Sequence, residues 1–439
     1  MNKRVAIIGG GYTGMVAALR LSQTGDFVCL YEKSTVLGGL ATGIKFQGTT
    51  IERAYHHIFR TDRDIIKLAG ELGCEDKLHW YPSSIAVVDQ HGTSPFASPF
   101  DLLKFSRLPL RDRIRLGAVL FYLQQKPKWS TTNTVTATQW LRRACGERVY
   151  RVVWEPLLVG KFHDAAPEVS MAWLWARVHT RAASRSLLRG EELGYFEGGF
   201  QTFTHALEQQ LRKQGVQVIF GSSVSSLRTL PDRQVTLTVG DERKVFDAVI
   251  CTIPSRVFAS LIVGDLQASP DYLTQLNAME YLGAICITFS TPQSLSRFYW
   301  HNINYRTSPF LVFIQHTNLV SAASYQGQHV YYLGAYLPHE HELFRAPPEH
   351  LQATFFTHLQ KFFPMFNPAR VTEIVVSKLP YAQHVVGQNY SSIRPSVQTP
   401  LPNVYLSNFS QIFPEDRGTN FAVRAGNDVA QQVLRSVMG

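Results

Sequence analysis

The sequence predicts an α/β protein with two regions, one built on a parallel sheet and the other a mixed α+β region. Three observations lead to this fold class. Val5–Ile8 and Val28–Tyr31 are short apolar runs typical of buried parallel strands, and a helical pattern over Thr13–Thr24 separates them. Further strand-like runs begin near Val216, far along the chain. At 439 residues the chain is too long for one ordinary core.

A glycine turn joins the first strand to the helix and fits G-x-G-x-x-G at Gly9, Gly11 and Gly14. The first glycine allows a tight turn, the second lets the backbone approach a pyrophosphate, and the third lets helix and strand pack closely. The helix N-terminus attracts phosphate. Glu32 follows 18 residues after Gly14, where a carboxylate can accept hydrogen bonds from ribose hydroxyls. The pattern predicts a dinucleotide site; the alternative is a turn that serves helix packing alone. The neighbours included in this site are Tyr12, Thr13 and Lys33.

A second glycine pair, Gly38 and Gly39, follows the acid, and Thr42 lies just downstream. This extension resembles that of a large FAD-binding family. The family includes amine oxidases, protoporphyrinogen oxidases, phytoene and other carotenoid desaturases and, more distantly, UDP-galactopyranose mutases. The resemblance implies FAD rather than NAD as the cofactor, held in a Rossmann-like domain of the GR2 type, with Leu40 beside it.

Later segments resemble the places where this family returns to its FAD domain. Residues 195–203 resemble the re-entry segment, and Val224 matches a valine whose backbone meets the adenine. Asn408 stands at the ribityl position, although relatives carry Gly-Asp or Gly-Glu where this chain has Ser407-Asn408. The turn and helix start at residues 418–423 would place backbone amides on the flavin pyrimidine; the alternative is a surface loop before an ordinary helix. The residues implied there are Asn420, Phe421 and Ala422.

The resemblance also implies that the FAD-binding domain is discontinuous. We expect it to comprise residues 1–79, 195–255 and 380–439. Residues 80–194 and 256–379 would then form the substrate-binding domain, the first piece mainly helical and the second a mixed sheet with a helix around residues 348–363. Tyr331, Tyr332 and Tyr336 are expected to face its cavity.

Two histidines are the candidate catalytic residues. His56 and His57 lie in a segment that passes the flavin ring in the family, and His57-Ile58-Phe59 resembles a run in the mutase branch. The resemblance therefore implies that His57, Ile58 and Phe59 also contact the cofactor. A histidine there with a pKa near neutrality could move protons during substrate oxidation. The alternative is a pair of histidines at a surface turn, bonded to backbone carbonyls.

Composition describes a globular chain, with 45% hydrophobic and 17% charged residues. The net charge is +10, but the sequence shows no motif of a nucleic-acid-binding module, so we expect no nucleic-acid partner. Five widely spaced cysteines show neither metal spacing nor a disulfide framework, which favours a reducing cytoplasm and no metal. We expect no signal peptide, because the glycine turn begins before a hydrophobic segment could fit, and no membrane-spanning helix, because no apolar run is long enough.

Residues 104–129 mix seven Lys or Arg side chains with a strongly apolar helix. Two interpretations remain open for this segment. It could rest on a bilayer interface, as a membrane-associated surface, or it could be a helical cap over the substrate cavity. A charged run at Glu415, Asp416 and Arg417 has no predicted role.

Three hypotheses for function follow. In the first, an FAD-dependent oxidoreductase of the oxidase, dehydrogenase or desaturase type moves a hydride to flavin N5 from a largely apolar small molecule, isoprenoid or carrying an anionic head. In the second, the protein is a non-redox nucleotide-sugar mutase of the UDP-galactopyranose mutase type. In the third, it binds FAD without redox activity. The electron acceptor, whether oxygen, quinone or another molecule, stays open.

Overall fold

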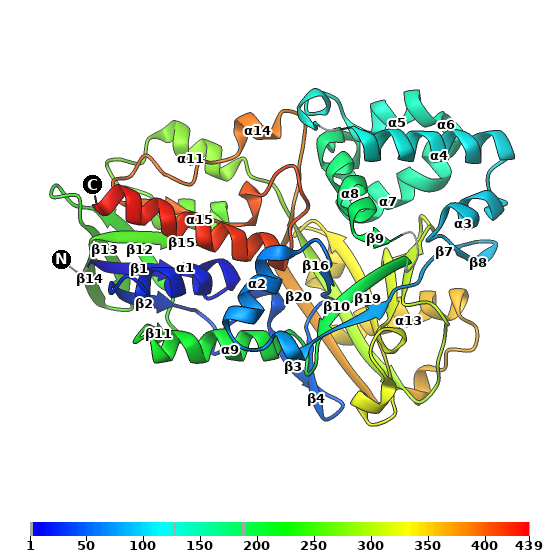
Figure 1. The fold of residues 1–439 in the computed structure, drawn as a ribbon, viewed down its shortest axis with the longest axis horizontal. Coiled ribbons are helices and arrows are strands. Elements are labelled where there is room, and N and C mark those ends of the chain that lie inside the picture. The colour runs from blue at the N-terminus through cyan, green and yellow to red at the C-terminus, as the bar shows by residue number, and fades with distance from the viewer. Residues whose placement is uncertain (1–2, 127, 187–189, 439) are drawn as a thin grey trace.

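A computed structural model describes residues 3–126, 128–186 and 190–438 (Figure 1). One region is organised on a five-stranded sheet of order β11-β2-β1-β15-β21, in which all neighbouring strands run parallel. Both faces of this sheet are covered, which explains why its strands are continuous apolar runs. The strand bounds are β1 Arg4–Ile8, β2 Phe27–Tyr31, β11 Gln217–Ile219, β15 Ala248–Cys251 and β21 Val404–Leu406.

Residues of β1 alternate between the two covering layers. Val5 and Ile7 pack in the cluster formed with the helical layer, whereas Ala6 and Ile8 pack with a three-stranded antiparallel sheet. Cys29 and Cys251 are buried core residues of this region. The helices of the first layer are α1 Tyr12–Ser22, α2 Arg63–Glu71, α9 Phe200–Lys213 and α15 Thr419–Met438. The opposite layer comprises β12 Val224–Thr229, β13 Val235–Val239, β14 Glu242–Phe246, α10 Ser255–Leu261 and α11 Pro270–Asn277.

The second region is built on a seven-stranded mixed sheet of order β20-β16-β19-β18-β17-β7-β8. Helix α13, Pro348–Phe362, packs on one face, close to the predicted bounds. The opposite face turns toward the first region. The strands are β7 Ile85–Asp89, β8 Gly92–Pro95, β16 Tyr281–Thr291, β17 Trp300–Ile303, β18 Val312–Gln315, β19 His329–Leu337 and β20 Glu373–His384.

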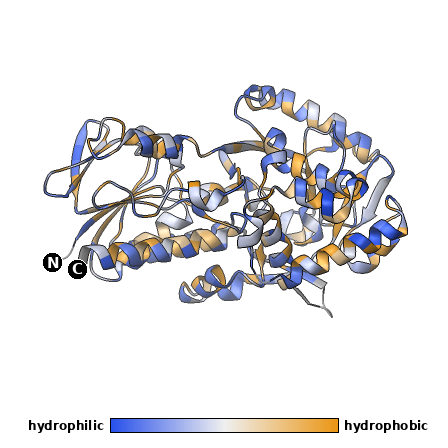
Figure 2. Cartoon of the chain, turned by 90° about the horizontal axis from the view of Figure 1, so that it is seen from above, coloured by the Kyte–Doolittle hydropathy of each residue, from blue (hydrophilic) through white to orange (hydrophobic). Residues whose placement is uncertain are grey.

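A helical cluster with its own apolar core lies beside this sheet, at the end of the molecule opposite the termini (Figure 1). Hydrophobic and hydrophilic residues lie side by side along the helices at that end (Figure 2). No helix among the described residues combines the length and the apolar character needed to cross a membrane. The helices are α3 Pro99–Lys104, α4 Leu110–Gln125, α5 Ala137–Cys145, α6 Glu147–Val149, α7 Glu155–Phe162 and α8 Met171–Ala183.

Small strand pairs connect the regions. Strand β10, Gly190–Phe196, lies between β5, Ile58–Phe59, and β6, Leu78–Pro82, and also pairs with β9, Arg185–Ser186. The predicted domain limits at residues 79, 194 and 379 fall inside β6, β10 and β20, because these strands run on from one region toward the other. The division into two domains stays a prediction. The remaining short elements are β3 Gly43–Phe46, β4 Thr49–Glu52, α12 Glu342–Arg345 and α14 Tyr390–Ile393.

Candidate cofactor and substrate site

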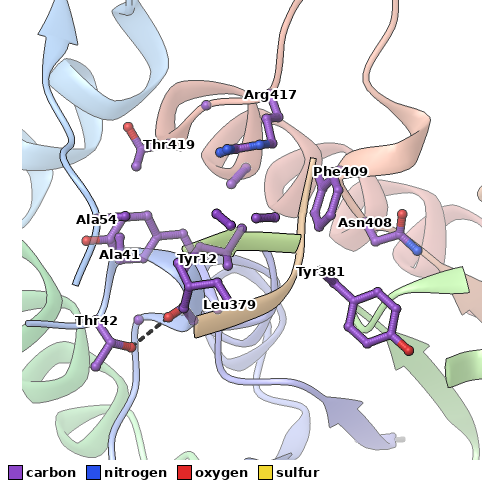
Figure 3. A pocket seen from close by; sticks show the side chains of 18 of the residues that line it. Tyr12, Ala41, Thr42, Ala54, Leu379, Tyr381, Asn408, Phe409, Arg417 and Thr419 are labelled. Carbon is purple, nitrogen blue, oxygen red and sulfur yellow. Dashed lines mark hydrogen bonds between the residues drawn. The ribbon is translucent and has the colours of Figure 1, made fainter. Parts of the chain in front are cut away.

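A cavity of about 680 Å³ begins at the carboxyl edge of the parallel sheet and extends to the seven-stranded sheet. Parallel strands bring their carboxyl ends to one edge, so the loops after β1, β2, β15 and β21 all reach it. Figure 3 shows Tyr12 and Thr42 from the N-terminal segments, Tyr381 from β20, and Phe409 and Arg417 from the C-terminal segment around the same space.

The two glycine runs of the N-terminal segment lie side by side. Gly11 forms a bridge with Gly38, and the Gly38 amide donates to the Gly10 carbonyl at 2.9 Å. A Cβ on Gly39 would lie 3.1 Å from the Gly11 Cα, and one on Gly14 would lie 2.0 Å from the Gly9 carbonyl oxygen. Gly14 and Gly39 are therefore packed too closely against neighbouring backbone to carry side chains.

Glu32 braces this glycine loop as well as lining the cavity. Its Oε2 accepts a hydrogen bond from the Gly10 amide at 2.7 Å, and its Oε1 accepts one from the Ser34 amide at 2.8 Å. The residue is 9% exposed. The carboxylate thus fixes the turn from which the predicted ribose contact would be made.

The C-terminal segment closes the opposite side of the cavity. The Asn408 amide donates to the Ile253 carbonyl at 2.8 Å and to the Ser255 hydroxyl at 3.2 Å, and its oxygen accepts from Ser410. This side chain therefore ties the end of β21 to the segment after β15, a role that its expected ribityl contact did not include. Helix α15 begins at Thr419, and the first amides of a helix have no intrahelical acceptor.

The cavity brings together nearly all of the predicted cofactor residues. Gly14 and Ile58 are not among its lining residues. Gly14 is taken up by helix–strand packing, and Ile58 is fully buried because β5 turns its side chain into the core. The predicted residues that do line the cavity are Gly9, Gly11, Tyr12, Thr13, Glu32, Lys33, Gly38, Gly39, Leu40, His56, His57, Phe59, Val224, Asn408, Asn420, Phe421 and Ala422.

Both histidines face the cavity, in buried surroundings that favour their neutral form. Burial lowers the pKa of His56 to about 4 and that of His57 to about 3, so both rings are neutral at neutral pH. His56 Nδ1 lies 2.7 Å from the Ala54 carbonyl oxygen, which requires a proton on Nδ1 and leaves Nε2 unprotonated. The pKa of each ring thus lies below the near-neutral value that favours proton transfer, and the catalytic role of both residues stays a prediction.

A charged cluster at the far end of the cavity was not predicted as a site. Asp416 accepts from Lys161 Nζ at 2.6 Å, from Arg177 Nη1 at 2.5 Å and from Trp173 Nε1 at 3.3 Å. Lys161 is only 8% exposed. The neighbouring cations hold the pKa of Asp416 far below its ordinary value despite burial, while burial lowers the pKa of Lys161. The sequence offered one signal here, the charged run at residues 415–417, but nothing in it paired that run with helices α7 and α8.

Arg417 extends this cluster toward the seven-stranded sheet. It donates to the Tyr336 hydroxyl at 2.8 Å, and its Nε is buried without a hydrogen-bond partner among the described residues. Tyr336 lines the cavity as expected. Tyr331 and Tyr332 do not: Tyr331 packs on the α13 side of the sheet, and Tyr332 lies in the core between the regions.

None of the described residues of segment 104–129 lines this cavity. Helix α4 packs instead on α8, whose Arg177, Thr180 and Arg181 do line the cavity. Helix α8 thus lies between this segment and the cavity, and the interpretation of the segment as a helical cap stays a prediction.

The residues present fit a dinucleotide cofactor. A Cβ built on Gly11 would have nothing nearer than the Gly39 Cα at 3.9 Å, so the loop is open toward the cavity. Helices α1 and α15 both begin at the cavity wall, where their free amides favour negative charge. A bare glycine cradle that continues into a chamber between two sheets defines the class of dinucleotide-dependent enzymes.

The particular family follows from comparison with known proteins. The pattern of the flavin containing amine oxidoreductases matches residues 12–434. The chain therefore belongs to this family of flavin-dependent oxidoreductases.

Named relatives are distant in sequence. The coproporphyrinogen III oxidase of Staphylococcus aureus (strain NCTC 8325 / PS 47) is 24% identical over 59% of this chain, which spans only 62% of that relative. The 15-cis-phytoene desaturase of Synechococcus elongatus is 22% identical, with 98% of this chain and 96% of the relative covered. A solved structure of reduced UDP-galactopyranose mutase superposes with a TM-score of 0.77 at 17% identity, covering 99% of this chain and 96% of the other. That last likeness concerns the fold alone.

Proposed function

We propose that this protein is an FAD-dependent oxidoreductase that removes a hydride from a carbon atom of a largely apolar small molecule carrying an anionic group. The observation that carries the proposal is the continuity of one cavity from the glycine cradle to the Asp416 cluster. FAD supplies the hydride acceptor when bound.

FAD is favoured over smaller flavins by the adenine end of the site. The loop after β1, Glu32 and Val224 lie at one end of the cavity, where a nucleotide half would bind. A flavin without the nucleotide would leave this glycine cradle without a ligand. The second glycine pair, packed against the first, supports an extended cofactor along the same wall.

The walls of the chamber support an apolar substrate with one anionic end. Trp300, Leu311, Tyr336, Tyr381 and Phe409 contribute aromatic and aliphatic surface. The cationic side chains that line the same cavity outside the glycine cradle are Arg53, Lys161, Arg177, Arg181, Lys378 and Arg417. The acidic side chains that line the cavity outside the glycine cradle are Asp62, Glu415 and Asp416, so six cations stand against three carboxylates there. Guanidinium groups bind carboxylate and phosphate by paired hydrogen bonds, so a substrate with such a group would be oriented there.

The chain's own groups then have defined tasks. Arg177 and Arg417 would hold the anionic end, and the aromatic walls would exclude water from the reacting carbon. The neutral His56 ring, unprotonated at Nε2, can accept a hydrogen bond from a substrate but is a weak base. The relatives named for coproporphyrinogen and phytoene oxidation suggest two substrate types for testing, a tetrapyrrole carboxylate and a polyene hydrocarbon.

The test is anaerobic reduction of the bound flavin. The purified protein should be yellow, and FAD should be released on denaturation. Substrates should be offered as a panel of a reduced tetrapyrrole carboxylate, a polyene hydrocarbon, a diamine and UDP-galactopyranose. Bleaching of the flavin by the reduced tetrapyrrole carboxylate is the expected result. Bleaching by the diamine alone would contradict a substrate with an anionic group. Turnover of UDP-galactopyranose only after chemical reduction, with no net redox change, would overturn the proposal in favour of a mutase.

A further inference from the structure

Helices α3 and α4 carry large apolar side chains on their solvent side. Among the described residues fourteen large apolar side chains are exposed, and six of them fall between residues 100 and 122. This concentration is what separates the surface from the scattered apolar residues that every protein exposes. We call it the α3–α4 face; it consists of Phe100, Leu103, Leu110, Ile114, Phe121 and Tyr122, which are 75%, 48%, 58%, 59%, 64% and 51% exposed.

The spacing along α4 shows that this exposure is a continuous stripe. Leu110, Ile114 and Phe121 stand at i, i+4 and i+11, which places them on one side of a helix. The core contact of the same helix is made by Leu116 and Leu123, both fully buried. Helix α4 is thus apolar on the side that packs and on the side that does not, whereas an ordinary surface helix is polar on its outer side.

Positive charge surrounds the stripe. Residues 100–129 hold seven Lys or Arg and only two acidic side chains, a net charge of +5 out of +10 for the whole chain. Asp101 is engaged in the capping box of α3, and Asp112 lies near Arg111 and Arg148. Lys104 and Arg111 are both exposed, the Arg111 side chain at 80%. An apolar stripe set among cations matches the headgroup and upper acyl layer of an anionic membrane leaflet.

We propose that the α3–α4 face docks on the surface of an anionic lipid bilayer, with the apolar side chains inserted and the cations at the headgroups. The docked surface lies one helix away from the cavity, because α4 packs on α8 and α8 lines the cavity. A protein held in this way would meet apolar molecules where they concentrate. This inference concerns the surface only and does not depend on the proposed oxidation.

The test is flotation of the flavin-loaded full chain with vesicles of phosphatidylcholine alone or mixed with phosphatidylglycerol. Wild-type protein should float with the anionic vesicles, less with the neutral ones, and less still at high salt. The triple variant Leu110→Ser/Ile114→Ser/Phe121→Ser should lower the partition coefficient by roughly thirtyfold or more. The matched control, Val263→Ser/Leu266→Ser/Met365→Ser, removes three apolar side chains that are 60%, 100% and 57% exposed elsewhere and should float like wild type.

A second pair of variants tests the charge. Lys104→Gln/Arg111→Gln should weaken binding to anionic vesicles by roughly tenfold or more and leave the weak binding to neutral vesicles unchanged. Lys213→Gln/Lys361→Gln, on the exposed sides of α9 and α13, is the control. Melting temperature and flavin content establish that each variant is folded, and the single change Phe121→Ser replaces the triple variant if that one is unstable.

Three results would overturn the proposal. The first is a wild-type protein that floats with neither vesicle. The second is equal loss of binding in the triple variant and its matched control. The third is a wild-type dimer that dissociates in the triple variant while vesicle binding is absent, which would assign the α3–α4 face to a second copy of the chain.

Discussion

At the residue scale, single carboxylates organise both ends of the cavity. Glu32 holds the glycine loop through the Gly10 amide, and Asp416 gathers Lys161 and Arg177 from two helices. Each carboxylate therefore serves the conformation of the protein as well as the surface offered to a ligand. The conformational role and the ligand-binding role can be separated by measuring stability and ligand affinity on the same variants.

Glu32→Ala should weaken FAD binding, because it removes the predicted ribose acceptor and releases the Gly10 amide. The expected loss is about 1–3 kcal/mol, or roughly five- to 150-fold in Kd. Titration of the apoprotein with FAD, followed by flavin fluorescence, measures it. Glu32→Gln, which keeps an acceptor for Gly10, should lose less. Unchanged affinity in the alanine variant, judged against Glu242→Ala on exposed β14, would contradict the assignment.

Asp416→Asn should destabilise the folded protein by about 3 kcal/mol, because Lys161 and Arg177 lose their buried counter-charge. Urea unfolding of the apoprotein gives this difference. Adding Lys161→Met should restore part of it, since the unpaired ammonium is removed. Asp164→Asn, whose side chain is 92% exposed, is the control. No difference between these two asparagine variants would show that the cluster does not depend on Asp416.

The pH dependence of this change has a defined sign. The pKa of Asp416 is lower in the folded than in the unfolded protein. Its contribution is therefore fully present above the unfolded value near pH 4 and is lost as the pH falls. The difference in the free energy of unfolding between wild type and Asp416→Asn should therefore become smaller as the pH falls below about 4.

At the element scale, side chains from distant segments complete the helices and hairpins around the cavity. Helix α2 is an example, since its own N-cap residue Asp62 makes no capping bond to it. Asn420, at the start of α15, accepts from the Asp64 amide at 2.8 Å and the Ile65 amide at 3.2 Å instead. Two helices that meet at the cavity are thereby joined.

Asn420→Ala should cost about 1 kcal/mol of stability, the usual effect of losing a helix cap. The measurement belongs on the apoprotein, because the backbone of Asn420 is a predicted flavin contact. Asn420→Asp keeps a capping oxygen and should stay near wild type. If Asn420→Asp lost as much stability as Asn420→Ala, the side-chain NH2 group rather than the capping oxygen would account for the effect.

The hairpin β3–β4 is attached through a buried acid. Glu52, 1% exposed, accepts from the Phe200 amide at 2.6 Å and the Tyr195 hydroxyl at 2.8 Å, and burial raises its pKa to about 7. The folded state then binds more protons than the unfolded state between the two pKa values. The contribution of Glu52 to stability should therefore fall as the pH rises from its pKa in the unfolded protein toward its pKa in the folded protein.

Between about pH 5 and pH 8, ionisation of Glu52 should lower the free energy of unfolding of the wild-type protein by up to about 3 kcal/mol. Glu52→Gln, which stays neutral, should show a correspondingly flatter profile. Denaturant unfolding at several pH values measures both. Parallel profiles for the two proteins would contradict the raised pKa.

At the scale of the whole molecule, the cavity is walled by both sheets and by the helical cluster. Residues from β1 to α15 line it, and small strand pairs around β10 connect the regions. A bound cofactor would therefore contact segments that are far apart in the chain. Its binding energy should be shared by the whole fold.

FAD at about a thousand times its Kd should stabilise the protein by about 4 kcal/mol relative to the apoprotein. Because both regions line the cavity, calorimetry should show one unfolding transition that moves upward as a unit. Two transitions, of which only one responds to FAD, would show that the regions unfold independently.

The sequence by itself determined the cofactor half of this protein. The glycine spacing, the acid at Glu32 and the apolar runs are local patterns whose geometry follows from neighbouring residues, so the α/β fold and most of the cradle could be predicted. That the Ile58 side chain points into the core could not be predicted, because the facing of a two-residue strand depends on the strand with which it pairs. The neutral form of His56 and His57 could not be predicted either. Their pKa is set by burial, and burial depends on the complete fold.

Only the tertiary structure decided the far end of the cavity and the outer surface. Lys161, Arg177 and Asp416 are up to 255 residues apart, and no local pattern records that α7, α8 and the C-terminal segment converge. The same holds for α4, which has apolar residues around most of its circumference. Which of them face solvent depends on where α8 packs, and that is fixed by long-range contacts rather than by helical periodicity.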